Sequence, residues 1–145
     1  MGNYDILIEN AKKAKTFSYA PYSKFHVGAA LLGKNGVVYT GCNVENAAFG
    51  PSNCAERTAL FKAVSEGCRE FSAIAVISDS PDCVSPCGVC RQALAEFCGP
   101  DLTVLMCRAD GTCRETTLGS LLPESFGASD LAGAGEQNPV SGNQT

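Results

Sequence analysis

Two cysteine motifs that lie far apart in the chain place the strongest constraint on how it can fold. Cys54 opens a C-x-E motif, and Cys87 and Cys90 form a C-x-x-C pair, each at the start of a predicted helix. A C-x-x-C pair at a helix start spaces two sulfurs so that they can share one metal ion. Cys54 can supply a third ligand if the two helices begin near each other. We therefore expect a fold that brings both helix N-termini to one edge of a sheet.

Three protein ligands are typical of a catalytic zinc site, because the fourth tetrahedral position is left for water. Glu56 follows Cys54 by two residues, which brings its carboxylate near the ion without making it a ligand. A metal ligand followed two residues later by glutamate, with P-C-x-x-C further on, is the signature of zinc deaminases. We therefore predict that Cys54, Cys87 and Cys90 bind one zinc ion and that Glu56 is the catalytic residue that carries protons.

Three thiolates make such a zinc site net negative, which opposes the formation of hydroxide. The partial positive charge of the two helix N-termini offsets part of this charge. Arg57, next to Glu56 in the sequence, can donate hydrogen bonds to the thiolates. We therefore expect Arg57 to tune the zinc ion rather than to bind a substrate.

A structural zinc ion held by four cysteines is the alternative interpretation. Cys83 precedes Cys87 by four residues and is the obvious fourth ligand, with Cys98 a poorer one. A C-x-x-C pair alone favours a structural site, because such sites are common. The C-x-E motif at Cys54 reverses that preference and favours the catalytic interpretation.

The composition disfavours several classes of protein. The 145 residues suffice for one domain with its own core, and the apolar runs are too short to cross a membrane. The net charge of -4 and the lack of a basic stripe disfavour nucleic acid as a partner. No secretory signal is recognisable at the N-terminus, so we expect a cytoplasmic protein whose nine cysteines stay reduced.

Hydrophobic periodicity and turn signals predict an α/β fold. Strands are expected at residues 27–32, 37–43, 71–78, 102–107 and 112–116, and helices at residues 4–17, 54–66, 88–97 and 118–122. Asp110-Gly111 is a hairpin turn signal, so the fourth and fifth strands should be antiparallel. The predicted architecture is a three-layer α-β-α sandwich around a mixed five-stranded sheet. It occupies residues 1–128, and the composition of residues 129–145 predicts a disordered tail.

Six segments carry recognisable motifs: Ala20–Ser23, Phe25–Ala30, Gly41–Ala47, Cys54–Thr58, Pro86–Gln92 and Leu121–Gly127. Together they closely resemble the small homotetrameric cytidine deaminases, over most of the chain. The resemblance implies the cytidine deaminase-like fold, one zinc ion per subunit and a pyrimidine nucleoside as substrate. The implied reaction is hydrolytic deamination of cytidine and deoxycytidine to uridine and deoxyuridine with release of ammonia, by a zinc-activated water, as in pyrimidine salvage.

The resemblance also implies roles for residues outside the metal site. Asn43 and Glu45 are implied to hydrogen-bond the 3'-hydroxyl of the ribose. Phe25 is implied to lie against the substrate, and the backbone of Ala55 is implied to contact the pyrimidine carbonyl.

A homotetramer whose subunits share their sites is implied by the resemblance alone. In that arrangement Phe126 lies over the base of an adjacent protomer, and Phe49 lies near the sugar. The sequence departs from the family at two positions. His26 stands where proline is frequent, and Phe49 stands where tyrosine is common, which removes a hydroxyl contact. We expect no catalytic role for His26.

Three other functions are compatible with parts of the sequence. A deaminase of the blasticidin S type shares the zinc motif, but that group resembles this chain less at the segment around Glu45. A deaminase of polynucleotides is disfavoured by the acidic charge. A zinc-stabilised binding module or an inactive scaffold is disfavoured by the intact set of zinc ligands and Glu56.

Overall fold

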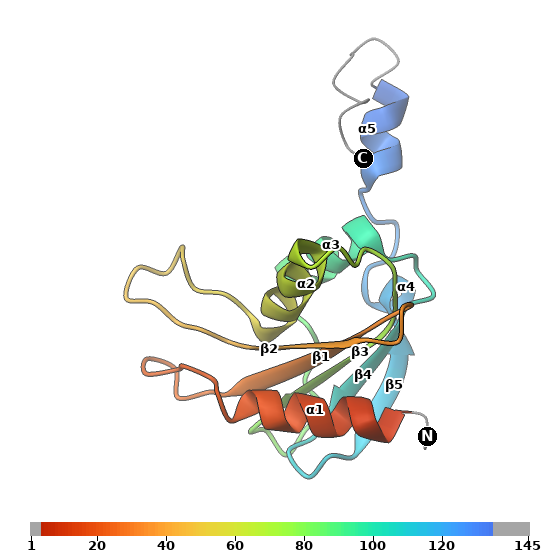
Figure 1. Cartoon of the computed structure of the whole chain (residues 1–145). Coiled ribbons are helices and arrows are strands. Elements are labelled where there is room, and N and C mark those ends of the chain that lie inside the picture. Colours follow the sequence, from red (N-terminus) through yellow and green to blue (C-terminus); the bar gives the residue numbers. More distant parts are fainter. Residues whose placement is uncertain (1–3, 135–145) are drawn as a thin grey trace.

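A five-stranded mixed sheet forms the centre of the computed structural model, which describes residues 4–134 (Figure 1). Its strands are β1 (Val27–Gly33), β2 (Val38–Cys42), β3 (Phe71–Ser78), β4 (Thr103–Cys107) and β5 (Cys113–Thr117). They lie in the order β2-β1-β3-β4-β5. The β3–β4 pair is parallel, whereas the other neighbouring pairs are antiparallel. The predicted mixed sheet and the antiparallel β4–β5 pair are confirmed.

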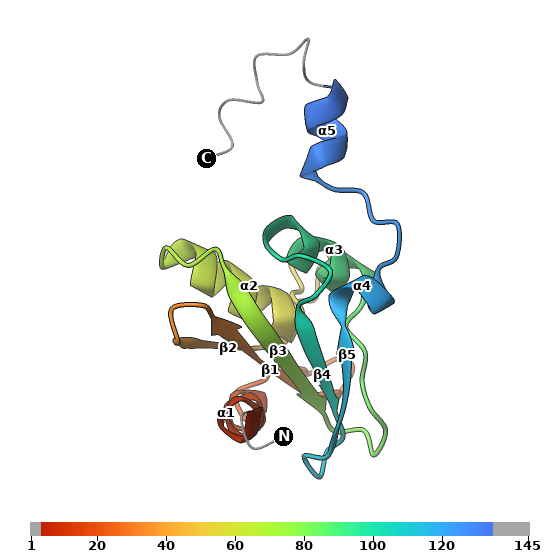
Figure 2. The same cartoon turned by 90° about the vertical axis from the view of Figure 1, so that its right-hand side faces the viewer.

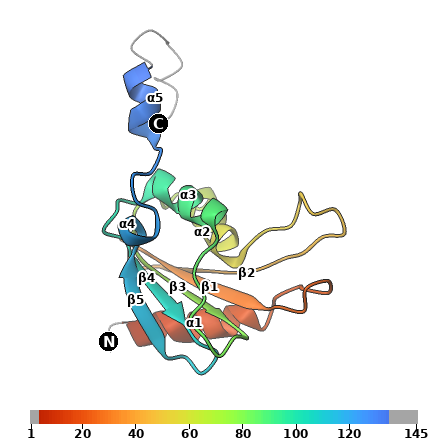
Figure 3. The same ribbon diagram turned by 180° about the vertical axis from the view of Figure 1, so that it is seen from behind.

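Helices cover both faces of this sheet, which confirms the predicted three-layer α-β-α sandwich. Helix α1 (Asp5–Lys15) covers one face, and α2 (Ala55–Ser65) and α3 (Gly88–Phe97) lie side by side on the other (Figures 1 and 2). Helix α4 (Leu118–Leu121) follows β5, and α5 (Ala128–Ala134) extends away from the sheet (Figure 3). Within residues 4–134, no helix is long and apolar enough to cross a membrane.

Strand β3 lies in the middle of the sheet and is covered on both faces, as its nearly continuous apolar sequence predicts. Ile74 and Val76 point into the core beneath α2 and α3. Ala73, Ala75 and Ile77 point to the opposite face, where α1 packs. Successive side chains alternate between the two cores because the side-chain period of a strand is two residues.

The first turn of α2 lies directly on β2 at Gly41. A Cβ atom on Gly41 would collide with the backbone of Ala55 and Ala59. Glycine therefore permits a close approach that no other residue allows. This contact fixes the start of α2, where Cys54 and Glu56 are located.

The order of the elements places two helix N-termini at one end of the sheet. Helix α2 directly precedes β3 and runs back across the sheet, and α3 follows β3 through the loop at residues 79–87. Both helices therefore begin beside the carboxyl end of β3, as the two cysteine motifs require. Clefts at the carboxyl ends of strands are the usual binding sites of α/β folds.

The start of the C-terminal tail differs from the sequence-based expectation. The composition predicts disorder from residue 129, whereas residues 128–134 form helix α5. Alanine favours helix, and the carboxylate of Asp130 in the first turn accepts a hydrogen bond from the Gly127 N–H at 2.8 Å. Residues 135–145 lie outside the described residues, so the domain boundary at residue 128 stays a prediction.

One cysteine pair also corrects an expectation. Cys107 and Cys113 form a disulfide, although all nine cysteines were expected to be reduced. The two residues face each other across the β4–β5 pair, where facing Cβ atoms come close enough for such a bond. The other seven cysteines are free thiols, and the predicted metal ligands are among them.

Candidate metal centre and substrate pocket

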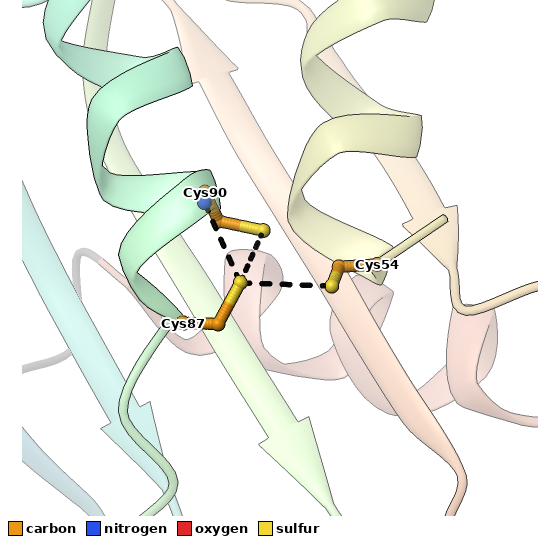
Figure 4. A group of neighbouring side chains, drawn as sticks. All are labelled: Cys54, Cys87 and Cys90. Atoms are coloured by element: carbon orange, nitrogen blue, oxygen red, sulfur yellow. Dashed lines mark hydrogen bonds between the residues drawn. The ribbon is translucent and has the colours of Figure 1, made fainter. Parts of the chain in front are cut away.

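Three cysteine sulfurs converge between the starts of α2 and α3 (Figure 4). The Sγ atom of Cys87 lies 3.7 Å from that of Cys54 and 3.4 Å from that of Cys90. All three sulfurs lie within 4.8 Å of one another. Ligands that are each about 2.3 Å from a tetrahedral zinc ion are about 3.8 Å apart. The spacing of the sulfurs therefore fits a single zinc ion.

The backbone at each helix start holds these sulfurs in place. Cys54 and Cys87 occupy the N-cap positions of α2 and α3 with extended backbone, at φ -77°, ψ 155° and φ -65°, ψ 164°. Cys90 is fully buried on the first turn of α3, and its N–H donates to the sulfur of Cys87 at 3.5 Å. Because N–H groups at helix starts carry partial positive charge, both helices stabilise negative sulfurs.

Arg57 reaches the metal centre, as the sequence predicts. Its Nη2 atom donates to the Cys54 sulfur at 3.3 Å. The Cys90 thiol and Arg57 lower the pKa of Cys54 to about 5, against the effect of burial. The proximity of Cys54, together with burial, raises the pKa of Cys90. Neighbouring thiols resist ionising together, so an ionised Cys54 opposes ionisation of Cys90, and a cation bound between them would relieve that opposition.

The alternative structural site would need a fourth cysteine. Among residues 4–134, the group of side chains able to share one ion consists of Cys54, Cys87 and Cys90. Neither Cys83 nor Cys98 belongs to it, and burial raises the pKa of Cys98 to about 12. The geometry therefore favours the three-ligand, catalytic interpretation.

Glu56 lies on the first turn of α2 beside the metal centre. Its side chain is buried, with 4% of the residue exposed, and it lines the same pocket as Cys54 and Cys87. Burial, reinforced by the negative charge of Cys54, raises the pKa of Glu56 to about 7. A carboxyl group with a pKa near neutrality can both accept and donate a proton. Glu56 therefore has the position and the proton affinity of a general acid and base.

A pocket of about 490 Å³ opens over the metal centre, a size typical of small-molecule sites. The predicted substrate residues that line it are Phe25, Asn43, Glu45, Phe49 and Ala55. The loops before β1 and after β2 supply most of these side chains. The structure thus brings together every predicted site residue except Phe126.

Asn43 connects the pocket to the loop before β1. Its amide nitrogen donates to the Phe25 carbonyl at 2.8 Å, and its amide oxygen accepts from the Val27 N–H at 2.9 Å. The Ser18 hydroxyl also donates to that oxygen. A side-chain amide has two N–H donors. Among residues 4–134 only one of them has a partner, so the other is available to a ligand.

Glu45 binds the same loop through its carboxylate. One oxygen accepts from the N–H groups of Tyr22 and Ser23, each at 3.0 Å, and the other accepts from the Ser23 hydroxyl. The bonds from Ser23 lower the pKa of Glu45, which keeps it ionised. Each carboxylate oxygen can accept two hydrogen bonds. The residues of the described range fill both sites of the first oxygen and one site of the second, so the second oxygen can accept one more bond. Asn43 and Glu45, which line the same pocket, therefore keep one donor and one acceptor for a ligand.

Phe126 lies outside this pocket. Its carbonyl accepts a hydrogen bond from the Gln92 side chain at 2.8 Å, and 59% of the residue is exposed. The ring therefore does not line the pocket of its own chain. Its implied place in the site of a neighbouring subunit stays a prediction.

Arg91 links the metal loop to the C-terminal segment, which the sequence analysis missed. Its guanidinium donates to the Ser85 hydroxyl at 2.6 Å, to the Pro86 carbonyl at 2.8 Å and to the Leu121 carbonyl at 2.6 Å. The position of Arg91 directly after Cys90 was the available signal. Ser85 and Pro86 lie close to Arg91 in the sequence, but Leu121 is 30 residues away, and no pattern in the sequence indicates that contact.

The fold and the site define an α/β protein with a zinc centre of the deaminase type. The zinc-binding region of the cytidine and deoxycytidylate deaminases matches residues 1–107. A cytidine deaminase of Sporosarcina psychrophila is 53% identical over 131 residues, which cover 90% of this chain and 96% of that protein. A crystal structure of cytidine deaminase from Burkholderia pseudomallei matches with a TM-score of 0.80 and 51% identity, over 83% of this chain and 97% of that one. The chain therefore belongs to the cytidine and deoxycytidylate deaminase family.

A second activity is represented among the similar proteins. A blasticidin-S deaminase of Bacillus cereus is 34% identical over 128 residues, which cover 83% of this chain and 89% of that protein. The identity is lower than that of the cytidine deaminases above. The family match and the three converging sulfurs together identify the cofactor of this chain as zinc.

Proposed function

We propose that the protein deaminates cytidine and deoxycytidine hydrolytically, giving uridine or deoxyuridine and ammonia. The observation that carries this proposal is the buried Glu56 beside three metal-ligating cysteines, at the base of a pocket of nucleoside size. The relatives named cytidine deaminase are 51–53% identical to this chain over 83–90% of its length, which supports a pyrimidine nucleoside as the substrate.

Proton transfer by Glu56 is the main contribution of the chain to this reaction. A zinc ion held by Cys54, Cys87 and Cys90 would act as a Lewis acid and would lower the pKa of the attacking water. Glu56 takes a proton from the attacking water and passes it to N3 of the pyrimidine while the C4–O bond forms. It then moves the hydroxyl proton to the amino group, and the C4–N bond breaks to release ammonia. A pKa of about 7 suits both directions of transfer.

The remaining pocket residues hold the substrate for this transfer. Asn43 and Glu45 would bind the 3'-hydroxyl of the sugar through the donor and the acceptor that the loop leaves free. The Phe25 ring would lie against the substrate, and the backbone of Ala55 would contact the pyrimidine carbonyl. Arg57 would tune the metal through its hydrogen bond to Cys54 rather than contact the substrate.

A homotetramer with shared sites completes the proposal. Phe49 is 85% exposed and Phe126 is 59% exposed in the single chain, so both rings are accessible to an adjacent subunit. In the assembly Phe126 would cover the base in an adjacent subunit, and Phe49 would lie near the sugar. We place the protein in the cytoplasm, because the thiols of the metal site must stay reduced to bind zinc. The Cys107–Cys113 disulfide is an exception to the reduced state that this compartment favours.

Ammonia release from cytidine by the zinc-loaded protein tests the activity, with Glu56→Gln as the matched control. Glutamine keeps the size of the side chain but cannot carry a proton. We expect the variant to keep its zinc and to lose turnover by at least about 100-fold. Comparable turnover by the two proteins would refute the role of Glu56. If the wild type acts on blasticidin S and not on cytidine, the substrate assignment is wrong.

A further inference from the structure

The peptide unit that joins Phe25 to His26 is held at both ends by side chains. Asn43 donates to the Phe25 carbonyl at 2.8 Å. On the other side, the Asp79 carboxylate accepts from the His26 N–H at 3.0 Å. A peptide unit is planar, so these two bonds fix its orientation and thereby the direction of the Phe25 side chain.

Asp79 is itself tied to the core of the fold. It directly follows β3, and its second oxygen pairs with the Lys15 ammonium at 3.2 Å. Lys15 ends α1 and also donates to the Ser78 carbonyl at 3.2 Å. Burial opposes ionisation of Asp79, but the bonds from His26 and Lys15 outweigh it and lower the pKa of Asp79. The carboxylate is therefore a fixed, charged acceptor attached to the central strand and α1.

The remaining anchors of this loop all belong to the pocket. Glu45 holds Tyr22 and Ser23, and the Ser23 hydroxyl accepts from the Phe25 N–H at 3.0 Å. The loop also contains Lys24 at φ 61°, a backbone conformation that costs energy for a residue other than glycine. Asp79 is the anchor that would not itself touch a nucleoside, because it does not line the pocket.

We propose that Asp79 is a positioning residue, which accepts the His26 N–H and thereby holds Phe25 against the substrate. This inference rests on the proposed function. It is particular to chains like this one, because proline, which is frequent at this position in the family that the sequence resembles, has no N–H to donate. His26 thus contributes through its backbone, and its ring needs no part in the reaction.

The His26→Pro and His26→Ala variants separate the backbone donor from the side chain. His26→Pro removes the N–H, and we expect it to raise KM for cytidine by about three- to tenfold with kcat within about twofold, the effect of losing one charge-assisted bond on a partly exposed loop. His26→Ala keeps the N–H and should behave like the wild type. Equal KM values in the two variants, whether both raised or both unchanged, would overturn the proposal. Zinc content and Tm verify that both variants fold.

Changes at Asp79 test the other partner of the bond. Asp79→Ala should reproduce the KM increase of His26→Pro, and Asp79→Asn, which keeps an oxygen acceptor, should restore most of it. Lys15→Met breaks the ion pair and the bond to the Ser78 carbonyl but leaves the Asp79 acceptor for His26 in place, so it should raise KM less than Asp79→Ala. The double variant His26→Pro with Asp79→Ala should be no worse than either single one, because both remove the same interaction. Additive effects on KM would contradict the inference.

A measurement that does not depend on turnover tests this inference separately from the proposed function. Trypsin cleaves after Lys24, which is exposed in the same loop. Asp79→Ala should accelerate that cleavage, and Asp79→Asn should do so less, as followed by mass spectrometry. If the wild type releases no ammonia from cytidine, the proposed function fails, while this comparison still measures the anchor. Identical cleavage rates in the wild type and Asp79→Ala would show that Asp79 does not hold the loop.

Discussion

The two walls of the pocket are built in opposite ways. The metal wall consists of the first turns of α2 and α3, where Cys90 is fully buried and Glu56 is 4% exposed. The sugar wall consists of loops, where Phe25 is 40% exposed and Phe49 is 85% exposed. The groups proposed to carry out the reaction therefore lie on helix starts that pack against the core, whereas the groups proposed to bind the substrate lie on segments held by a few hydrogen bonds. Damage to the two walls should affect different kinetic parameters.

The largest effect should come from the metal wall itself. Cys90→Ser removes one of three ligands from a buried position, so we expect loss of zinc and of detectable turnover. Zinc content by mass spectrometry and ammonia release measure the two effects. Cys68→Ser is the control, because Cys68 is buried but lies outside the metal cluster. A Cys90→Ser protein that keeps zinc and activity would contradict the ligand assignment.

A smaller effect is expected on the sugar wall. Glu45→Ala removes the acceptor for Tyr22 and Ser23 together with the proposed contact to the sugar. We expect KM to rise by about tenfold or more and zinc content to stay unchanged. Glu115→Ala, at an exposed carboxylate on β5, serves as the control. Loss of zinc in Glu45→Ala would show that the two walls are not independent.

Arg57 lies between the two walls, and its substitution should weaken zinc binding without abolishing it. Arg57→Gln removes the cation that donates to Cys54, and we expect zinc affinity to fall by about tenfold, because groups that orient ligands have effects of this size. Competition with a chelator measures it. Arg57→Lys keeps the charge without the planar guanidinium and should recover part of the affinity. A raised KM at unchanged zinc affinity would assign Arg57 to the substrate instead.

The smallest effect is expected at Cys83, which sharpens the definition of the metal wall. Cys83 lies in the loop before Cys87 but outside the group of three sulfurs. Cys83 is partly buried, and serine is close to cysteine in size, so we expect Cys83→Ser to change zinc content and kcat/KM by less than about twofold. Zinc loss from this variant would revive the structural four-cysteine site.

The metal wall could be predicted from the sequence because its signals are local. Cys54, Glu56 and the Cys87–Cys90 pair stand at fixed offsets on helix starts, and helical geometry converts those offsets into positions. The strands were predictable for a similar reason, since the apolar run of β3 shows that both of its faces are buried. The substrate residues came only through resemblance to a family.

The features that escaped prediction have separate causes. Cys107 and Cys113 form a disulfide because they face each other across two strands, and a cysteine count does not reveal that pairing. Asp79 holds His26 across 53 positions of sequence, and neither residue stands in a motif that indicates the other. The helix at residues 128–134 begins in a segment whose composition resembles a tail.

The three hydrogen bonds of Arg91 have a genetic consequence. They fasten the loop that carries Cys87 to the segment that leads to Phe126. If sites are shared between subunits as proposed, the connected loop and C-terminal segment would contact the metal of their own chain and the substrate of a neighbouring chain. A substitution in this loop would then impair two sites at once. Co-expressed with normal chains, such an allele would be dominant-negative, whereas loss of Glu56 would silence only the site of its own chain.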